Sequence, residues 1–234
     1  MSFLKAEWRK LVMSNYEVNP KVLLPFVPKG TELDYYDDKC YVSLVGFMFI
    51  NTKLLGVKVP FHTNFEEVNL RFYVKRKEGD KYKRGVVFIK EIVPKPAITF
   101  IANTIYKENY QTLPMRHNWH FNEKEIKVSY HWKVNGESNT IAVESESKLV
   151  AIEPNTKIEF IAEHYWGYAK DKNRTTEYEV KHPTWKYYPV VNHTIDIDFK
   201  ATYGESFSFL KSIEPASVFL LEGSKISVEN KTVL

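Results

Sequence analysis

The sequence predicts an α+β fold dominated by antiparallel β-sheet, with a few short helices. Aromatic residues are dense, with 15 Tyr, 15 Phe and 5 Trp among 234 residues, and such residues favour strands. Hairpin patterns follow one another along the chain. The regular alternation of strands and helices that would indicate a parallel sheet is absent from the sequence pattern. Only 9 Gly are present and no stretch resembles a linker. We therefore expect one domain over residues 1–234.

The first half of the chain begins with a predicted helix. Apolar residues between positions 3 and 13 fall at a helical spacing. Asn19-Pro20 supplies a cap and a first-turn proline for a short helix through Phe26. After these helices we expect strands at 32–37 and 40–50, a hairpin of 65–75 with 82–91, and a helix from Ala97 to about Asn109.

The second half is predicted to consist mainly of hairpins. Asn135-Gly136 is the strongest turn signal in the chain, because both residues tolerate the positive φ of a tight hairpin turn. The expected strands are 115–122, 126–134, 138–146, 163–169, 175–182, 188–198 and 215–221, with a short helix near 156–162. The last ten residues are expected to be loosely held.

Composition and charge argue against several classes of function. The net charge is +4 and one dense basic patch lies between Lys75 and Arg84; we expect a solvated hairpin tip there and no nucleic-acid partner. The single cysteine, Cys40, excludes an intramolecular disulfide and is expected to be a small buried residue. We expect no metal and no cofactor. Without a signal peptide or a membrane-spanning run, a cytoplasmic protein with no membrane partner is expected.

Residues 65–74 form the most informative segment. Side chains alternate between the two faces of a strand, so Glu67, Asn69, Arg71 and Tyr73 share one face. Such a row suits the wall of a pocket for a small polar ligand, and it also suits an ordinary solvent-facing strand. If the face is enclosed, Arg71 needs a partner from another strand or a ligand, because an unpaired buried charge is costly. An enclosed arginine can bind a carboxylate through two parallel hydrogen bonds.

Two other segments carry candidate site residues. His62, just before this strand, is a candidate base or pocket donor, or an ordinary loop histidine. In the predicted helix, Asn103, Tyr106, Lys107 and Tyr110 share a face and could line a polar cavity. A lysine in an apolar cavity can act as a Schiff-base nucleophile, whereas a solvated helix lysine needs no special role.

Three stretches together resemble the YqjF-like family of uncharacterised bacterial proteins, related in fold to acetoacetate decarboxylase. The first is Pro60-x-His62-x-x-Phe65-x-Glu67-x-Asn69-x-Arg71-x-Tyr73-Val74. The second is Ala102-x-x-x-Tyr106-x-x-x-Tyr110, followed by Leu113-Pro114-Met115. The third runs from Phe160 through Glu163-His164-Tyr165 to His182-Pro183-Thr184-Trp185. Their order and spacing carry the resemblance, which covers most of the chain.

The resemblance implies an acetoacetate decarboxylase-like fold, a partly closed β-barrel or cone with an internal small-molecule cavity. Phe65-x-Glu67 looks like the counterpart of the motif that supplies an active-site acid in acetoacetate decarboxylases. The Schiff-base lysine of those enzymes has no counterpart, because Tyr110 or Gln111 occupies its place and Lys107 does not match. Asn103 stands where many YqjF-like chains are expected to carry arginine. Glu163 and His182 are added to the expected ligand-binding residues.

Two hypotheses follow for a small organic acid or carbonyl ligand, with a carboxylate as one option. In the first, the protein is a binder that keeps the cavity without the lysine. In the second, it is a lyase-like or hydrolase-like enzyme in which Arg71 holds the carboxylate, Glu67 transfers protons and His62, Tyr106 and Tyr110 orient the substrate. Asn69, Tyr73, Asn103, Glu163 and His182 complete the expected ligand-binding set. A homo-oligomer is left open.

Overall fold

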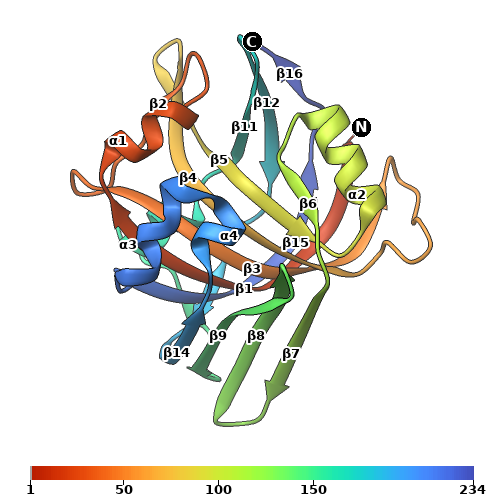
Figure 1. Cartoon of the computed structure of the whole chain (residues 1–234), viewed down its shortest axis with the longest axis vertical. Helices are drawn as coiled ribbons and strands as arrows, with labels where there is room; N and C mark the ends of the chain where they lie inside the picture. Colours follow the sequence, from red (N-terminus) through yellow and green to blue (C-terminus); the bar gives the residue numbers. More distant parts are fainter. Residues whose placement is uncertain (1) are drawn as a thin grey trace.

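Two β-sheets share one continuous apolar core in the computed structural model, which describes residues 2–234. The larger sheet curls into a ring, and the smaller sheet lies below it (Figure 1). Most strand pairs are antiparallel, while β5–β11 and β5–β6 are parallel. The predicted strand-dominated α+β fold with a few short helices is confirmed.

The larger sheet has 12 strands. In spatial order they are β10 (Val150–Ala151), β13 (Lys186–Tyr188), β15 (Ser217–Val228), β1 (Leu4–Val18), β3 (Cys40–Leu54), β4 (Phe65–Glu78), β5 (Lys81–Val93), β11 (Trp166–Asp171), β12 (Arg174–Lys181) and β16 (Thr232–Val233). Short strands β2 (Glu32–Leu33) and β6 (Tyr110–Thr112) add to β4 and β5. Pairing of β12 with β15 closes the ring through only two residue pairs, so the barrel is partly closed.

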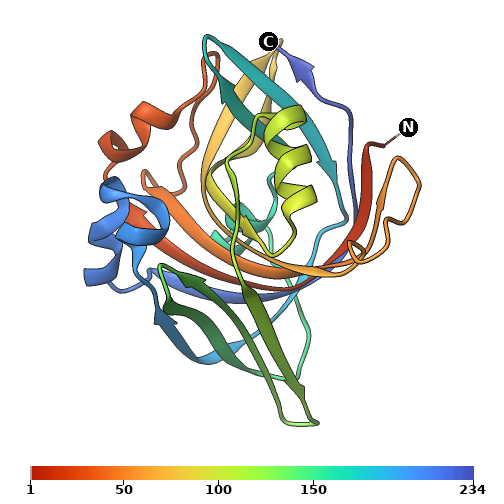
Figure 2. The same cartoon turned by 45° about the vertical axis from the view of Figure 1, so that its right-hand side comes forward.

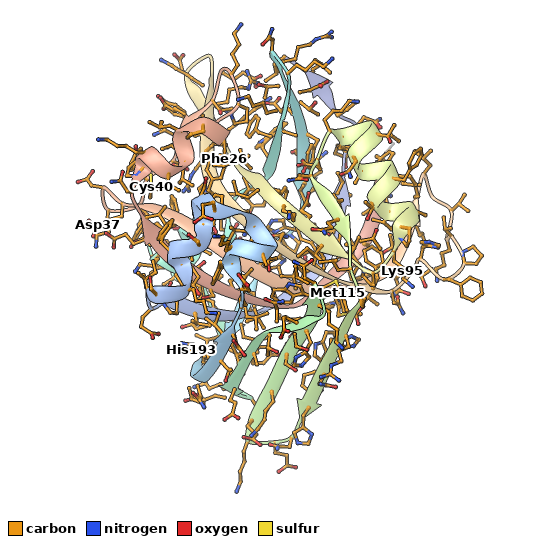
Figure 3. The ribbon with its side chains drawn as sticks, in the orientation of Figure 1. Phe26, Asp37, Cys40, Lys95, Met115 and His193 are labelled. Carbon is orange, nitrogen blue, oxygen red and sulfur yellow. The ribbon has the colours of Figure 1, made fainter. Side chains whose placement is uncertain are left out.

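The smaller sheet has four strands in the order β14 (Val190–Asp196), β9 (Glu137–Glu146), β8 (Glu125–Val134) and β7 (Met115–Phe121). Met115 marks the point where the chain leaves the ring for this sheet (Figure 3). The two sheets approach closely at Gly46 of β3, where an added Cβ would stand 2.8 Å from the ring of Tyr130 on β8.

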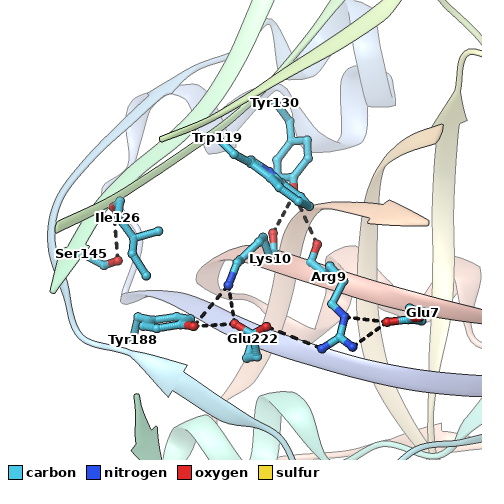
Figure 4. A network of polar contacts seen from close by, with 9 residues as sticks. All are labelled: Glu7, Arg9, Lys10, Trp119, Ile126, Tyr130, Ser145, Tyr188 and Glu222. Atoms are coloured by element: carbon cyan, nitrogen blue, oxygen red, sulfur yellow. Dashed lines mark hydrogen bonds and ion pairs between the residues drawn. The ribbon is translucent and has the colours of Figure 1, made fainter. Parts of the chain in front are cut away.

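Hydrogen bonds also fasten the smaller sheet to β1 (Figure 4). The Tyr130 hydroxyl donates to the carbonyl oxygen of Lys10 at 2.8 Å and accepts from Trp119 Nε1 at 3.2 Å. Lys10 Nζ in turn contacts Tyr188 and Glu222 on neighbouring strands of the ring. The buried Tyr130 therefore joins both sheets to one polar network.

The helical segments are short and lie at the edges of the ring. They are α1 (Pro20–Leu23) with the 3₁₀ helix η1 (Leu24–Phe26), α2 (Pro96–Ile101) with the π-helix η2 (Ala102–Tyr106), α3 (Lys157–Ala162), and α4 (Phe199–Tyr203) with the 3₁₀ helix η3 (Glu205–Ser212). Figure 2 shows α2 in front of the interior of the ring. Among the described residues, no helix has the length and apolar character needed to cross a membrane.

The predicted helix over residues 3–13 is wrong, because this segment belongs to strand β1. β1 is irregular at two places, between Lys5 and Glu7 and between Arg9 and Val12, and Lys10 has φ of 55°. A bulge adds a residue to one strand and shifts the period-two pattern. Trp8 and Leu11 therefore face the same cavity at a spacing of three residues, which imitates a helix.

Three smaller expectations also need correction. The strand expected at 32–37 is limited to β2, and it pairs with β4 rather than β3. The basic hairpin tip is only partly solvated, because Arg76 and Lys83 form ion pairs with Glu177 of β12 at 2.6 and 3.1 Å. The last ten residues are not loosely held, since they include the end of β15 and strand β16, both paired in the ring.

Other predicted elements agree with the structure within a few residues. The hairpin of β4 and β5, the three strands β7, β8 and β9, and the short helices at 20–26 and 157–162 are present. The predicted helix from Ala97 ends at Tyr106, where Lys107 adopts a left-handed conformation. Cys40 is buried as expected. The single-domain organisation stays a prediction.

Candidate functional site

A cavity of about 150 Å³ lies within the ring. Side chains from β1, β3, β4, β5, β11 and β12 form its wall, and residues of α2 and η2 line one side. Figure 2 shows the ribbon of α2 in front of the ring. Most of the lining is apolar, with aromatic rings such as Trp8, Phe47 and Phe65. A small set of polar side chains is embedded in this apolar wall, an arrangement typical of small-molecule sites.

Three of the four side chains in the polar row of β4 face this cavity. Glu67, Asn69 and Arg71 all line it and are only 2%, 2% and 7% exposed. The alternate residues Val68 and Leu70 pack in the core on the other face of the strand. Both faces of β4 are therefore buried. The polar face lies against an enclosed cavity and does not face solvent.

Arg71 has few partners inside the protein. One guanidinium nitrogen donates to the carbonyl oxygen of Ile161 at 3.2 Å. Its Nε is buried and has no hydrogen-bond partner in the protein. Arg71 takes part in none of the ion pairs found among residues 2–234, so it has no carboxylate partner there. A buried guanidinium with free donors is suited to an anionic ligand.

Glu67 is held by two donors in the cavity wall. Asn69 Nδ2 donates to Glu67 Oε1 at 2.9 Å, and the Tyr110 hydroxyl donates to Oε2 at 3.0 Å. Burial raises the pKa of Glu67 to about 7, against the lowering effect of these two hydrogen bonds and of the Arg71 charge. The carboxyl group can therefore exchange a proton near neutral pH.

Two further carboxyl groups line the cavity that the sequence pattern does not predict, Glu91 of β5 and Glu108 just before β6. The Tyr178 hydroxyl donates to Glu108 Oε1 at 2.7 Å. Burial raises the pKa of Glu108 to about 8, and the nearby charge of Glu67 adds to this rise. Burial also raises the pKa of Glu91 well above its usual range, with the charges of Glu108 and Glu67 contributing.

The position of Glu91 depends on a bulge that the sequence pattern does not reveal. The β4–β5 register shifts between Leu70 and Arg71, so Arg71 pairs with Phe88 and Asn69 pairs with Glu91. Simple alternation from Phe88 would place Lys90 in the cavity, whereas Lys90 Nζ contacts the carbonyl oxygen of Thr202 outside it. The signal present in the sequence is the charged pair Lys90-Glu91 within the apolar residues of segment 86–93.

His164 also lines the cavity; it lies within the Glu163-His164-Tyr165 motif but is not among the predicted site residues. Asp34 stands 3.2 Å from its Nε2 and also binds Arg84 Nε at 2.7 Å. Burial lowers the pKa of His164 to about 4. At neutral pH the ring is neutral, and with Nε2–H donated to Asp34 its buried Nδ1 is an acceptor without a partner in the protein.

The remaining predicted site residues divide into two groups. His62, Tyr106 and Tyr110 line the cavity, although the Tyr106 hydroxyl donates to the carbonyl oxygen of Glu229. The side chains of four others are engaged in contacts elsewhere in the protein, and their role in ligand binding stays a prediction. These are Tyr73 with Ser43, Asn103 with the backbone of Tyr110, Glu163 with Tyr165, and His182 stacked on Trp185.

Lys107 lies outside the cavity. Its side chain is exposed and its backbone has φ of 63° at the end of η2. The cavity lining found among residues 2–234 includes no lysine. In the same part of the chain, no group of three or more His, Cys, Asp or Glu side chains is placed to hold a metal ion.

Solved structures with the same architecture define the class of fold. The enduracididine biosynthesis enzyme MppR with HEPES bound superimposes with a TM-score of 0.70 at 12% identity, over 100% of this chain and 88% of that one. The acetoacetate decarboxylase of Legionella pneumophila subsp. pneumophila str. Philadelphia 1 gives 0.66 at 10% identity, over 99% and 86%. The MppR complex with pyruvate gives 0.68 at 10% identity, over 100% and 91%. The fold is acetoacetate decarboxylase-like.

Sequence comparison then identifies the family. The model of the uncharacterized conserved protein family DUF2071 matches residues 5–225, and the chain belongs to this family. The uncharacterized protein YqjF of Bacillus subtilis (strain 168) is 31% identical over 86 residues, which is 36% of this chain and 34% of YqjF. The chain thus matches about a third of that relative's length. The resemblance drawn from the three motifs is confirmed.

Proposed function

We propose that the protein binds a small organic acid or carbonyl compound in the ring cavity, with Arg71 holding a carboxylate group of the ligand. The observation that carries this proposal is the isolation of the Arg71 guanidinium. It is 7% exposed, lines the cavity and has a buried Nε without a partner in the protein. A carboxylate would satisfy these donors through two parallel hydrogen bonds.

The neighbouring groups fit the same ligand. Tyr110 and Asn69 fix the Glu67 carboxyl group beside the space that the ligand would occupy. The neutral His164 supplies an acceptor, and His62 lies at the cavity on the loop before β4. The apolar lining from Trp8 and Phe47 would enclose the carbon skeleton. Pyruvate bound to MppR, a protein of the same fold, makes pyruvate a reasonable first probe.

A second candidate function is acid–base catalysis on such a ligand, as in a lyase-like or hydrolase-like enzyme. Burial raises the pKa of Glu67 to about 7. This favours acid–base catalysis, because a general acid or base is most effective when its pKa lies near the ambient pH. Proton transfer by Glu67 would not need an amine nucleophile. The exposed position of Lys107 argues against the Schiff-base route of acetoacetate decarboxylases.

Titration calorimetry with pyruvate tests the proposed function. The wild-type protein should bind, and Arg71→Ala should lose at least about tenfold in affinity, because a charge-assisted pair contributes about 1.5–3 kcal/mol. Arg174→Ala is the matched control, since it removes an exposed arginine outside the cavity lining. Equal affinity of all three proteins would contradict the role of Arg71.

A further inference from the structure

The cavity holds more acidic groups than a site for a simple acid requires. Glu67, Glu91 and Glu108 come from three separate segments and line the same space as Arg71. Charge on Glu67 or Glu108 raises the pKa of Glu91, so these carboxyl groups lie close enough to influence one another. Among the lining residues found within 2–234, Arg71 is the only arginine and no lysine is present; the other basic side chains there are histidines.

Two buried oxygen atoms in this cluster lack hydrogen-bond partners in the protein. Glu91 Oε2 and Asn69 Oδ1 are buried without a hydrogen-bond partner in the protein, and each residue is only 2% exposed. The two residues pair across β4 and β5, which places them side by side. The orientation of the Asn69 amide is set by its Nδ2, which donates to Glu67 Oε1. A buried polar atom without a hydrogen-bond partner costs about 1–3 kcal/mol.

The nearby hydroxyl donors are already engaged. The Tyr110 hydroxyl donates to Glu67, and the Tyr178 hydroxyl donates to Glu108. An ammonium group has three N–H donors and no acceptor, so it could satisfy Glu91, Asn69 and one further oxygen at once. Its charge would also compensate an ionised carboxylate in this apolar surrounding.

We propose that the ligand carries a protonated amine as well as a carboxylate, with the ammonium group on Glu91 and Asn69 and the carboxylate on Arg71. This inference rests on the proposed function for its carboxylate half. Asn69 and Arg71 are two residues apart on β4, about 7 Å along an extended strand. That separation favours an ω-amino acid over an α-amino acid, whose two charged groups are attached to one carbon.

Ionisation gives the inference a second observable. A bound ammonium stabilises the ionised form of Glu91, so binding should release a proton at neutral pH. Calorimetry in two buffers with different ionisation enthalpies measures that release. The other titratable or charged groups that face the cavity are His62, Glu67 and Arg71 in or near β4, Tyr106, Glu108 and Tyr110 in or near η2 and β6, His164 just before β11, and Tyr178 of β12.

The test compares three probes of equal chain length: 5-aminovalerate, valerate and pentylamine. 5-Aminovalerate should bind at least about tenfold more tightly than valerate, because it adds a charge-assisted hydrogen bond. Glu91→Gln should reduce this ratio to about one. Asn69→Ala provides a second variant if Glu91→Gln does not fold, with thermal melting to check both.

Each outcome separates the two proposals. Equal binding of valerate and 5-aminovalerate would overturn the ammonium site and leave the carboxylate site standing. Binding of pentylamine and 5-aminovalerate without valerate would overturn the carboxylate half, and with it the ligand class proposed here. An unchanged ratio in both variants would overturn the role of Glu91 and Asn69. No binding of any probe at millimolar concentration would overturn both proposals.

Discussion

Replacing Glu67 by Gln should stabilise the protein above neutral pH and change its stability little near pH 4.5. The amide keeps an oxygen that can accept from Asn69 or Tyr110, the two donors of the wild-type site. It removes the ionisation of a carboxyl group that is only 2% exposed. The effect of the substitution on the free energy of unfolding should therefore depend on pH.

The magnitude follows from the two pKa values of Glu67, 4.5 as the ordinary value and about 7 in the folded protein. Between these values the folded protein binds more protons than the unfolded chain, so the contribution of Glu67 to stability is complete below pH 4.5 and is lost as the pH rises to 7. At 1.36 kcal/mol for each pKa unit, the loss amounts to about 3 kcal/mol. The Glu67→Gln variant does not lose this stability as the pH rises, because its side chain does not ionise.

Urea denaturation of both proteins between pH 4.5 and pH 8.5 measures the difference. We expect the variant to gain stability relative to the wild type across the interval and then to reach a plateau. Glu123→Gln, an exposed position in the turn between β7 and β8, is the control and should follow the wild type at every pH. A constant difference between Glu67→Gln and the wild type would refute the reasoning.

Three further predictions address the side chain of Lys107, the contact between the two sheets and the cavity wall. Pyruvate with sodium borohydride should leave no adduct on Lys107, which is exposed outside the cavity; an adduct mapped there by mass spectrometry would revive the Schiff-base mechanism. Tyr130→Phe should lower the free energy of unfolding by about 1–3 kcal/mol, because it removes the hydroxyl between Lys10 and Trp119; the exposed Tyr82→Phe should have little effect, and equal denaturation midpoints would contradict this account. Gly167→Ala should destabilise by about 1–3 kcal/mol, because the new Cβ would lie 2.1 Å from the Tyr178 ring; unchanged thermal stability would show that this contact relaxes freely.

The sequence alone determined much of the local structure. The Asn135-Gly136 turn, the alternating strands that flank it and the β4–β5 hairpin were predicted because each depends on neighbouring residues. The polar row of β4 was also evident, since alternation alone places Glu67, Asn69 and Arg71 on one face. The resemblance carried by the three motifs added the partly closed barrel.

The tertiary structure decided where those faces point. Alternation shows which side chains share a face but not whether that face meets water, and packing on both sides of β4 settled this for Arg71. Bulges changed the pattern itself: one made β1 resemble a helix, and another brought Glu91 opposite Asn69. Glu108 and His164 reach the cavity from segments distant in the chain. Local sequence patterns do not predict these contacts between distant segments, because the contacts form only when the ring closes.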